Sequence, residues 1–522
     1  MRRLSVFALA LFLALVGVQL VIGPELFAPY VGRDAALLWI GAALAGAFFA
    51  ATWQPRQPQR WVTGLPRPGQ MLLATGIIVA LVAGVLQAPL AGSPFALMLQ
   101  LAWWLGLALT VAGAWWPGGR VEYATPQVHW AKDAAGAFVA MGGSARPDET
   151  VRLSRRSELV WLVALLLCAA LLRFWNLGNL PSGCAGSECV NGLRLVEGET
   201  MAGAGRLFED IARSAYWLTG NGVLSLRLAA GLLGLFTVGA VWAAARRLAG
   251  PTAALLSTLF VIFSPLHLWA GRTSDPWLAA GLLAALAIWW VAEALVQRSV
   301  RWWVLAGLAL GALFVQAPPL RWATLLWLLA VFVLAAIRAL RDIRRGEWVA
   351  IGAGVATALV ILLPAMLADG ATGLLFATAA AAQPTHNLAL LAATLLRADS
   401  AGLPASAQPG LLSGLALALA VIGAGGLARH FRTAVAIALL LGAALFAWFA
   451  ALLDSTLFPP AQVALVLLPF VYAAVAVTLD QFLEVLVHTW RIVVAPRRLV
   501  GAVAVVIGLV MAWNATGLMA GL

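Results

Sequence analysis

The residues most able to do chemistry in this chain lie in a polar loop that follows a long apolar run. The loop extends from Arg173 to Gly192, and Glu188 is its first carboxylate. A carboxylate can take a proton from an acceptor alcohol near neutral pH, which a serine hydroxyl cannot do. A polar loop of this kind, attached to a membrane helix, indicates chemistry on a substrate that the membrane delivers.

The elements that must position this loop are membrane helices. Of the 522 residues 63% are hydrophobic and only 10% are charged, and the mean hydropathy is +0.95. Soluble domains carry about 25% charged residues, and the alternation typical of a membrane β-barrel does not occur. We therefore expect an all-α polytopic membrane protein. The net charge of +12 lies in short clusters between apolar runs, which favours topology-setting charge over nucleic-acid binding.

Apolar runs long enough to cross about 30 Å of hydrocarbon as helices recur along the whole chain. They predict about fifteen transmembrane helices, at 4–22, 35–53, 71–89, 95–116, 158–175, 222–245, 253–270, 277–296, 302–319, 322–337, 348–368, 410–428, 433–452, 461–479 and 499–517.

The basic residues predict the orientation. With a cytoplasmic N-terminus, 24 of the 33 basic residues fall in cytoplasmic segments, as the positive-inside bias requires. The other nine are Arg33, Arg173, Arg194, Arg206, Arg213, Arg227, Arg272, Arg321 and Arg397. We expect a multi-pass protein of the plasma (inner) membrane in a bacterial cell envelope.

Long connections divide the chain. A cytoplasmic linker at 117–157 separates a four-helix membrane segment, 1–116, from a membrane domain, 158–522, with outer loops at 176–221 and 369–409. We expect the first segment to pack as an appendage that does not line the pocket around the polar loop.

The first outer loop contains an apolar pattern of its own. Its members are spaced four, four and three residues apart, and charged residues lie between them; they are Leu207, Ile211, Ala215 and Leu218. This spacing predicts an amphipathic helix that lies in the plane of the membrane interface.

Several motifs occur in the order known from one family. They are Leu172-Arg173 with Leu177 and Pro181, Ser187-Glu188, Asn191-Gly192, Glu197-Gly198-Glu199, Leu226-Arg227, Arg246-Arg247, Ser264-Pro265 with His267, and Gly271-Arg272 with Asp275-Pro276. In these residues the chain resembles the GT-C integral-membrane glycosyltransferases, in the branch of protein O-mannosyltransferases and aminoarabinose transferases. The resemblance covers about 160–340.

The resemblance implies a GT-C-like helical bundle that transfers a hexosyl or pentosyl group from a polyprenyl-phosphate sugar at the outer membrane face. In such a reaction a carboxylate deprotonates the acceptor, while cations or a divalent metal neutralise the departing phosphate. The implied partners are the polyprenyl-phosphate sugar lipid and the membrane, with no nucleic acid. No spacing of His, Cys and Asp predicts a dedicated metal site.

The resemblance also implies roles for single residues. Glu188 is the catalytic base, and Asp275 is a second catalytic carboxylate near the pocket. Arg272 and Arg227 are candidate phosphate partners, because a guanidinium binds phosphate through two hydrogen bonds. The remaining residues expected to bind substrate are Asn191 and His386, one on each outer loop.

Each assignment has a structural alternative. Asp275 can instead cap the helix that begins at Trp277. Arg272 can pair with Asp275 or extend to lipid headgroups, and His267 can be a satisfied histidine at the end of an apolar run.

The chain departs from the family at Ser187, which stands where the family has the first acidic residue of a pair. This leaves a second hypothesis, a catalytically silent relative that acts as a scaffold or lipid-binding subunit. A transporter is a third hypothesis, but the predicted spans are nearly free of ionisable residues apart from Glu293.

The three cysteines leave one question open. Cys168 lies inside an apolar run and is expected to be a small core residue. Cys184 and Cys189 lie in the outer loop, where an oxidising compartment permits a disulfide. The sequence alone is equally consistent with two free thiols.

Overall fold

The structure is a computed structural model. It describes residues 60–63, 67–87, 95–115, 120–123, 129–132, 138–141, 155–174, 177, 184, 187–199, 201, 205–342, 345–375, 387, 391, 411–429, 433–453 and 460–490.

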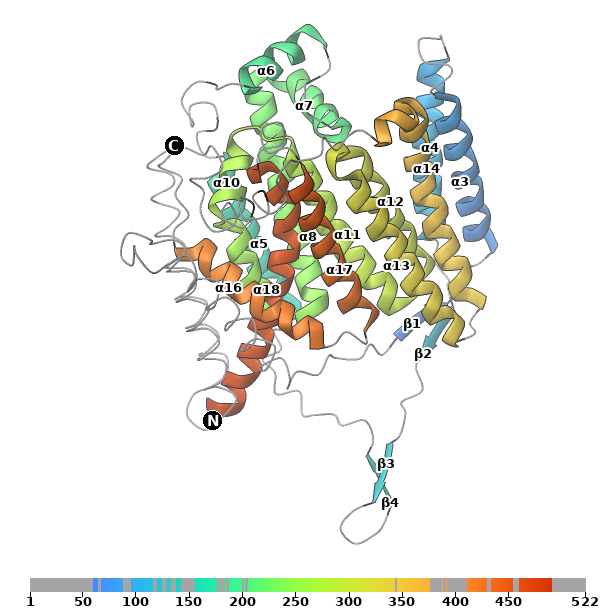
Figure 1. Cartoon of the computed structure of the whole chain (residues 1–522), viewed down its shortest axis with the longest axis vertical. Helices are drawn as coiled ribbons and strands as arrows, with labels where there is room; N and C mark the ends of the chain where they lie inside the picture. Colours follow the sequence, from blue (N-terminus) through green and yellow to red (C-terminus); the bar gives the residue numbers. More distant parts are fainter. Residues whose placement is uncertain are drawn as a thin grey trace.

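The described residues form a helical bundle (Figure 1). Its helices are α3 (Arg67–Gln87), α4 (Ala96–Ala114), α5 (Arg155–Phe174), α6 (Ser187–Glu197), α7 (Arg206–Thr219), α8 (Gly222–Ala249), α9 (Pro251–Ile262), α10 (Pro265–Arg272), α11 (Trp277–Gln297), α12 (Val300–Gln316), the short 3₁₀ helix η2 (Pro318–Leu320), α13 (Arg321–Asp342), α14 (Arg345–Leu375), α16 (Leu411–Arg429), α17 (Ala434–Leu452) and α18 (Pro460–Trp490).

Within the described ranges, seven helices are long and apolar enough to cross a membrane, or eight if α9 and α10 form one span. The prediction of a polytopic helical membrane protein is therefore confirmed. The figure of about fifteen spans stays a prediction, because the runs at 4–22, 35–53 and 499–517 lie outside the described residues.

The core lies around α8, α11 and α18. In the apolar middle of each helix, 72% of the residues of α11 and 89% of those of α18 are buried, whereas only 33% of those of α17 are buried. α11 packs against α8, α12 and α18. α12 and α14 approach closely because Gly307 and Gly354 face each other and a Cβ on either would meet the opposite backbone. Small residues at such crossings are the usual means of packing helices in lipid.

The predicted span at 253–270 is not straight. α9 and α10 are bent by 57° relative to each other. The break occurs because Ser264 accepts a hydrogen bond from the backbone N–H of His267 and Pro265 begins the next helix, an arrangement that starts a new helix instead of continuing the old one. The bend carries the end of α10 towards α5 and α8.

Short strands are present as well, which the all-α expectation did not include. They are β1 (Arg60–Thr63), β2 (Arg120–Tyr123), β3 (His129–Lys132) and β4 (Phe138–Met141). β1 pairs antiparallel with β2, and β3 with β4. Figure 1 shows β1 and β2 at the end of the bundle opposite α6 and α7, as expected if 117–157 and 176–221 lie on opposite sides of a membrane.

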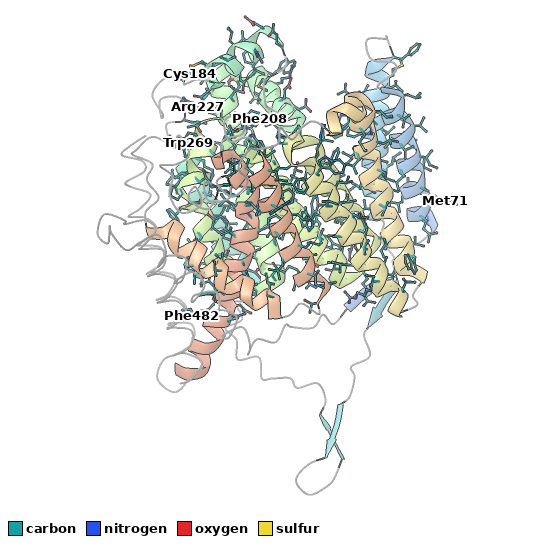
Figure 2. All side chains as sticks on the ribbon, in the orientation of Figure 1. Met71, Cys184, Phe208, Arg227, Trp269 and Phe482 are labelled. Atoms are coloured by element: carbon teal, nitrogen blue, oxygen red, sulfur yellow. A yellow bond between two sulfur atoms is a disulfide. The ribbon has the colours of Figure 1, made fainter. Side chains whose placement is uncertain are left out.

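α3 and α4 pack together and then against α14 and α12. The indole Nε1 of Trp103 donates to the carbonyl of Val360 at 3.4 Å. Figure 2 shows Met71 of α3 on the side of the molecule away from Cys184 and Arg227.

Ion pairs join helices at the end of the bundle where α8 finishes. Arg246 pairs with Glu158 of α5, Arg247 pairs with Glu293 of α11 at 3.3 Å, and Arg298 pairs with Glu347 of α14 at 3.2 Å. We call these three pairs the α8 C-terminal staples. They connect four neighbouring helices at one level of the bundle.

The predicted amphipathic helix is present as α7. Phe208, Ala212 and Ala215 are buried, and α7 packs on α8 and α12. Leu218 is exposed together with Trp217 in the last turn of α7, and the helix ends at Gly220. The placement of α7 in a membrane interface stays a prediction.

Candidate functional site

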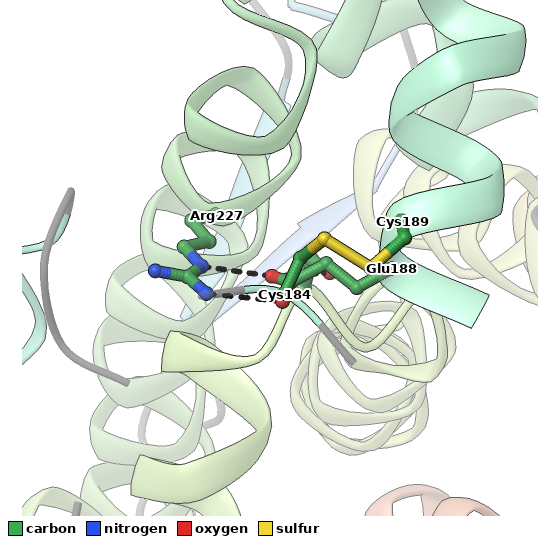
Figure 3. Close-up of a disulfide and its surroundings, with 5 residues drawn as sticks. Cys184, Glu188, Cys189 and Arg227 are labelled. Carbon is green, nitrogen blue, oxygen red and sulfur yellow. Dashed lines mark hydrogen bonds and ion pairs between the residues drawn. A yellow bond between two sulfur atoms is a disulfide. The ribbon is translucent and has the colours of Figure 1, made fainter. Parts of the chain in front are cut away.

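The central contact of the site is a buried ion pair between Glu188 and Arg227. Nε of Arg227 donates to Oε1 of Glu188 at 2.8 Å, and Nη2 donates to Oε2 at 3.0 Å (Figure 3). Glu188 is 7% exposed and Arg227 is 1% exposed. Bidentate arginine–carboxylate pairs are strong and geometrically specific. Glu188 is therefore held in one orientation by a residue 39 positions away in the sequence.

A third group fastens Glu188. The hydroxyl of Ser274, in the turn between α10 and α11, donates to Oε1 of Glu188 at 3.0 Å. Ser274 has a φ of 58°, the left-handed region that a residue with a Cβ rarely adopts. Such backbone strain persists where the surroundings enforce it and is found mostly at functional sites. Glu188 thus connects α6, α8 and the α10–α11 turn.

The sequence explains why Glu188 reaches this position. Glu188, Asn191, Gly192 and Leu195 are buried and recur at helical spacing, so α6 has one buried face. Gly192 lies against Gly222 at the start of α8. A Cβ on Gly222 would not fit, because it would meet the carbonyl oxygen of Gly192. The polar composition of this segment predicts a loop, although the spacing of three, one and three residues between its buried positions is also typical of a helix.

Asp275 lies next to Ser274 and is 6% exposed. Its Oδ1 accepts a hydrogen bond from the backbone N–H of Trp277 at 2.9 Å, so the alternative of a cap on α11 is confirmed. Burial raises the pKa of the Asp275 carboxyl to about 6, and the Trp277 hydrogen bond acts in the opposite direction. Within the described residues Asp275 has no ion pair.

Two arginines flank these carboxylates. Arg272, at the end of α10, is fully buried and donates through Nη1 to the carbonyl of Leu172 at 2.8 Å. Arg227 also donates, through Nη1, to the carbonyl of Leu177 at 3.2 Å. Both arginines therefore hold the end of α5 and the residues after it. Glu188, Arg227, Arg272 and Asp275 are each buried, and Ser274, which binds Glu188, lies between Arg272 and Asp275 in the sequence.

A second buried pair lies beside the site and was not predicted. Nη2 of Arg173 lies 2.7 Å from Nδ1 of His267. Because a guanidinium can only donate, Nδ1 of His267 accepts and the ring proton is on Nε2. Gly234 and Gly271 leave room for Arg173 between α8 and α10. Nε2 of His267 is buried without a hydrogen-bond partner among the described residues, so the expectation of a satisfied histidine is met only at Nδ1.

The other expected site residues are placed as follows. Asn191 is buried on the α6 face that carries Glu188. His386 lies outside the described residues, and nothing is described of the Ser187 side chain. The assignments of Asn191 and His386 as substrate-binding residues stay predictions.

The divalent metal stays an expectation. In the part of the chain that the structure describes, no group of three His, Cys, Asp or Glu side chains is close enough to hold a metal ion. The two buried carboxylates are also committed to Arg227, Ser274 and the Trp277 amide. The described residues of the site therefore do not form a metal-binding set.

Cys184 and Cys189 form a disulfide (Figure 3), which answers the question that the sequence left open. The bond encloses Glu188, the residue immediately before Cys189. Cys168 is a free cysteine on α5, partly buried against the core instead of inside it.

The chain matches a known family over part of its length. Residues 208–367 match the family model of dolichyl-phosphate-mannose-protein mannosyltransferase. Over this segment the chain is similar to that family. The segment includes Arg227, Arg272 and Asp275, whereas Ser187 and Glu188 precede it. The resemblance noted in the sequence is confirmed.

The chain is also similar to solved structures of other proteins. For ArnT from Cupriavidus metallidurans bound to undecaprenyl phosphate, the TM-score is 0.46 with 15% identity, and 70% of this chain and 75% of that chain are covered. For the Archaeoglobus fulgidus oligosaccharyltransferase in complex with Zn and sulfate, the TM-score is 0.42 with 14% identity, over 69% of this chain and 52% of that chain. A search of curated protein sequences finds no match.

Proposed function

We propose that this protein is a GT-C-type membrane glycosyltransferase that transfers a sugar from a polyprenyl-phosphate donor to an acceptor hydroxyl or amine at the outer membrane face. The family description names a sugar carried on dolichyl phosphate, which is a polyprenyl-phosphate sugar. The observation that carries the proposal is that Arg227 of the matched segment pairs with the buried Glu188, and that Ser274, two residues after Arg272 and next to Asp275, also binds Glu188.

Asp275 is the acceptor-activating base in this proposal. Glu188 accepts three hydrogen bonds from Arg227 and Ser274, whereas Oδ2 of Asp275 accepts none from the described residues. A base works best when its pKa is near the working pH, and the pKa of Asp275 is raised to about 6 by burial. Glu188, the base expected from the sequence, instead positions Arg227 and the turn that carries Asp275.

Three of these residues take part in the transfer itself. Asp275 takes the proton from the acceptor O–H or N–H as the acceptor oxygen or nitrogen bonds to the anomeric carbon. The bond between that carbon and the phosphate oxygen breaks, and its electron pair leaves with the polyprenyl phosphate. Arg227 and Arg272 stabilise the negative charge on this leaving group, an effect that is large where water is excluded.

The direct test is sugar transfer by the purified protein in lipid nanodiscs with synthetic polyprenyl-phosphate hexoses and pentoses. The proposal expects release of polyprenyl phosphate that requires both the wild-type chain and an acceptor. Ser187→Asp, which restores the family's acid, is expected to preserve or raise this activity.

The silent-relative alternative has its own support, namely Ser187 and the commitment of Glu188 to Arg227. If neither the wild type nor Ser187→Asp transfers sugar from any donor, this alternative replaces the enzyme. Donor lipid that still binds and stabilises the wild type would then indicate a lipid-binding subunit.

A further inference from the structure

The α6 helix that carries Glu188 is too short to hold itself in place. It has 11 residues, and isolated helices shorter than about 12–15 residues are marginal in water. At its C-terminal end, Nη2 of Arg213 donates to the carbonyl of Glu199 at 3.1 Å. In its middle, Gly192 packs on Gly222. The remaining end of the helix, its first turn, is the one that contains Glu188.

The Cys184–Cys189 disulfide lies at that first turn. Cys189 is the third residue of α6, and Cys184 lies ahead of the helix, so the bond closes a ring that contains Glu188. Helix ends fray because their terminal backbone groups have no partner within the helix. A covalent link from the third residue to the preceding segment limits fraying at the position that Arg227 and Ser274 require.

We propose that the Cys184–Cys189 disulfide is a positioning element that keeps Glu188 between Arg227 and Ser274, so that the site is assembled only in the oxidised protein. Cys184 is exposed, and a thiol reagent can therefore reach the bond. A dithiol such as dithiothreitol gives two electrons and two protons to the bond and is oxidised to its cyclic disulfide, while Cys184 and Cys189 become thiols. The proposal rests on the proposed function for its effect on catalysis, but its structural part is independent of it.

The first experiment uses the full chain in nanodiscs without substrate. Alkylation followed by mass spectrometry is expected to modify Cys184 and Cys189 only after reduction. Hydrogen exchange is then compared with and without dithiothreitol. Reduction is expected to speed exchange of the α6 amides after Glu188 by about tenfold or more, as local opening becomes easier, and to leave α11 unchanged. Free thiols before reduction, or unchanged α6 exchange after it, overturns the proposal whether or not the protein is a transferase.

The second experiment separates positioning from general stability. Reduction is expected to lower kcat by about tenfold to a hundredfold, because misplacement by about 1 Å can cost this much, and to leave the KM for the donor within about twofold. In the Glu188→Gln variant, reduction is expected to cause no further loss. An equal further loss in that variant, or a change in KM alone, contradicts the positioning role.

Cysteine variants provide the controls. Cys184→Ser with Cys189→Ser is expected to reproduce the reduced wild type and to be insensitive to dithiothreitol. Cys168→Ser removes the free cysteine on α5 and is expected to keep the full sensitivity. Sensitivity that is lost in Cys168→Ser would assign the effect to that thiol and overturn the proposal. If wild type transfers no sugar, the hydrogen-exchange comparison still decides the structural claim.

Discussion

The two ends of α8 hold carboxylates in different situations. At the C-terminal end each staple carboxylate has an arginine opposite, and in two of the three pairs the arginine side chain is 26% or 49% exposed. At the N-terminal end Glu188 and Arg227 are both almost fully buried, and the neighbouring Asp275 is buried without an ion pair among the described residues. The staples are suited to holding helices together. The other end has one buried carboxylate, Asp275, without an ion pair among the described residues, and this is the group that we propose as the base.

The largest expected effect is the loss of sugar-transfer rate in the Asp275→Asn variant. The amide oxygen can still accept from the Trp277 N–H, so the cap on α11 is kept, but an amide takes no proton. Sugar transfer is expected to fall by about 10²–10⁴-fold. Glu293→Gln, in a staple, is the matched control and should keep the wild-type rate. Comparable rates in Asp275→Asn and wild type would remove Asp275 as the base.

The next effect is on stability. Glu188→Gln leaves the Arg227 charge buried without its counter-ion, and breaking a buried pair in this way typically costs about 3–5 kcal/mol. Glu158→Gln faces an arginine that is 49% exposed, so its expected cost is only about 0–1 kcal/mol. Thermal unfolding of both variants in one detergent measures the difference. Equal losses would mean that the two ends of α8 are electrostatically alike.

A smaller effect is the pH dependence of stability. The folded pKa of Asp275, about 6, lies above the usual value near 4. Stability from this group is therefore fully present below about pH 4 and is lost as the pH rises through 6. The loss is at most about 3 kcal/mol. Asp275→Asn should remove this slope between pH 4 and 6, and an unchanged slope in unfolding measurements would show that another group titrates there.

The smallest expected effect is at Ser274. Ser274→Ala removes the hydrogen bond to Glu188 and keeps the left-handed backbone, so it should cost about 1 kcal/mol. Ser274→Gly also loses the bond but relieves the backbone, and should be the more stable of the two. Their unfolding temperatures, measured side by side, sharpen the role of the turn. The reverse order would show that the backbone of this turn is not strained.

The sequence predicted the membrane helices well because long apolar runs have few alternatives to a spanning helix. It also predicted α7, whose apolar period is clear, and the cap at Asp275, which needs only local geometry. It missed the bend between α9 and α10, since Ser264 and Pro265 interrupt an otherwise continuous apolar run.

The site was harder to predict than the fold. The motifs in the sequence contain every charged residue of the site. They do not predict that Glu188 pairs with Arg227, because only the packing of α6 on α8 brings these two residues together. The same packing pairs Glu188 with an arginine, whereas Asp275 has no ion pair among the described residues, and for this reason we propose Asp275 instead of Glu188 as the base. Such long-range pairings leave no periodic signal in a single sequence.

The measurement that tests the central claim most directly is the pH dependence of kcat in wild type and in Glu188→Gln. If Asp275 takes the acceptor proton, kcat of the wild type should rise with pH through about 6 and then level, because the base must be deprotonated. Glu188→Gln should be slower but should keep this rise. A rise that disappears in Glu188→Gln while Asp275→Asn retains it would assign the proton to Glu188 and contradict the account.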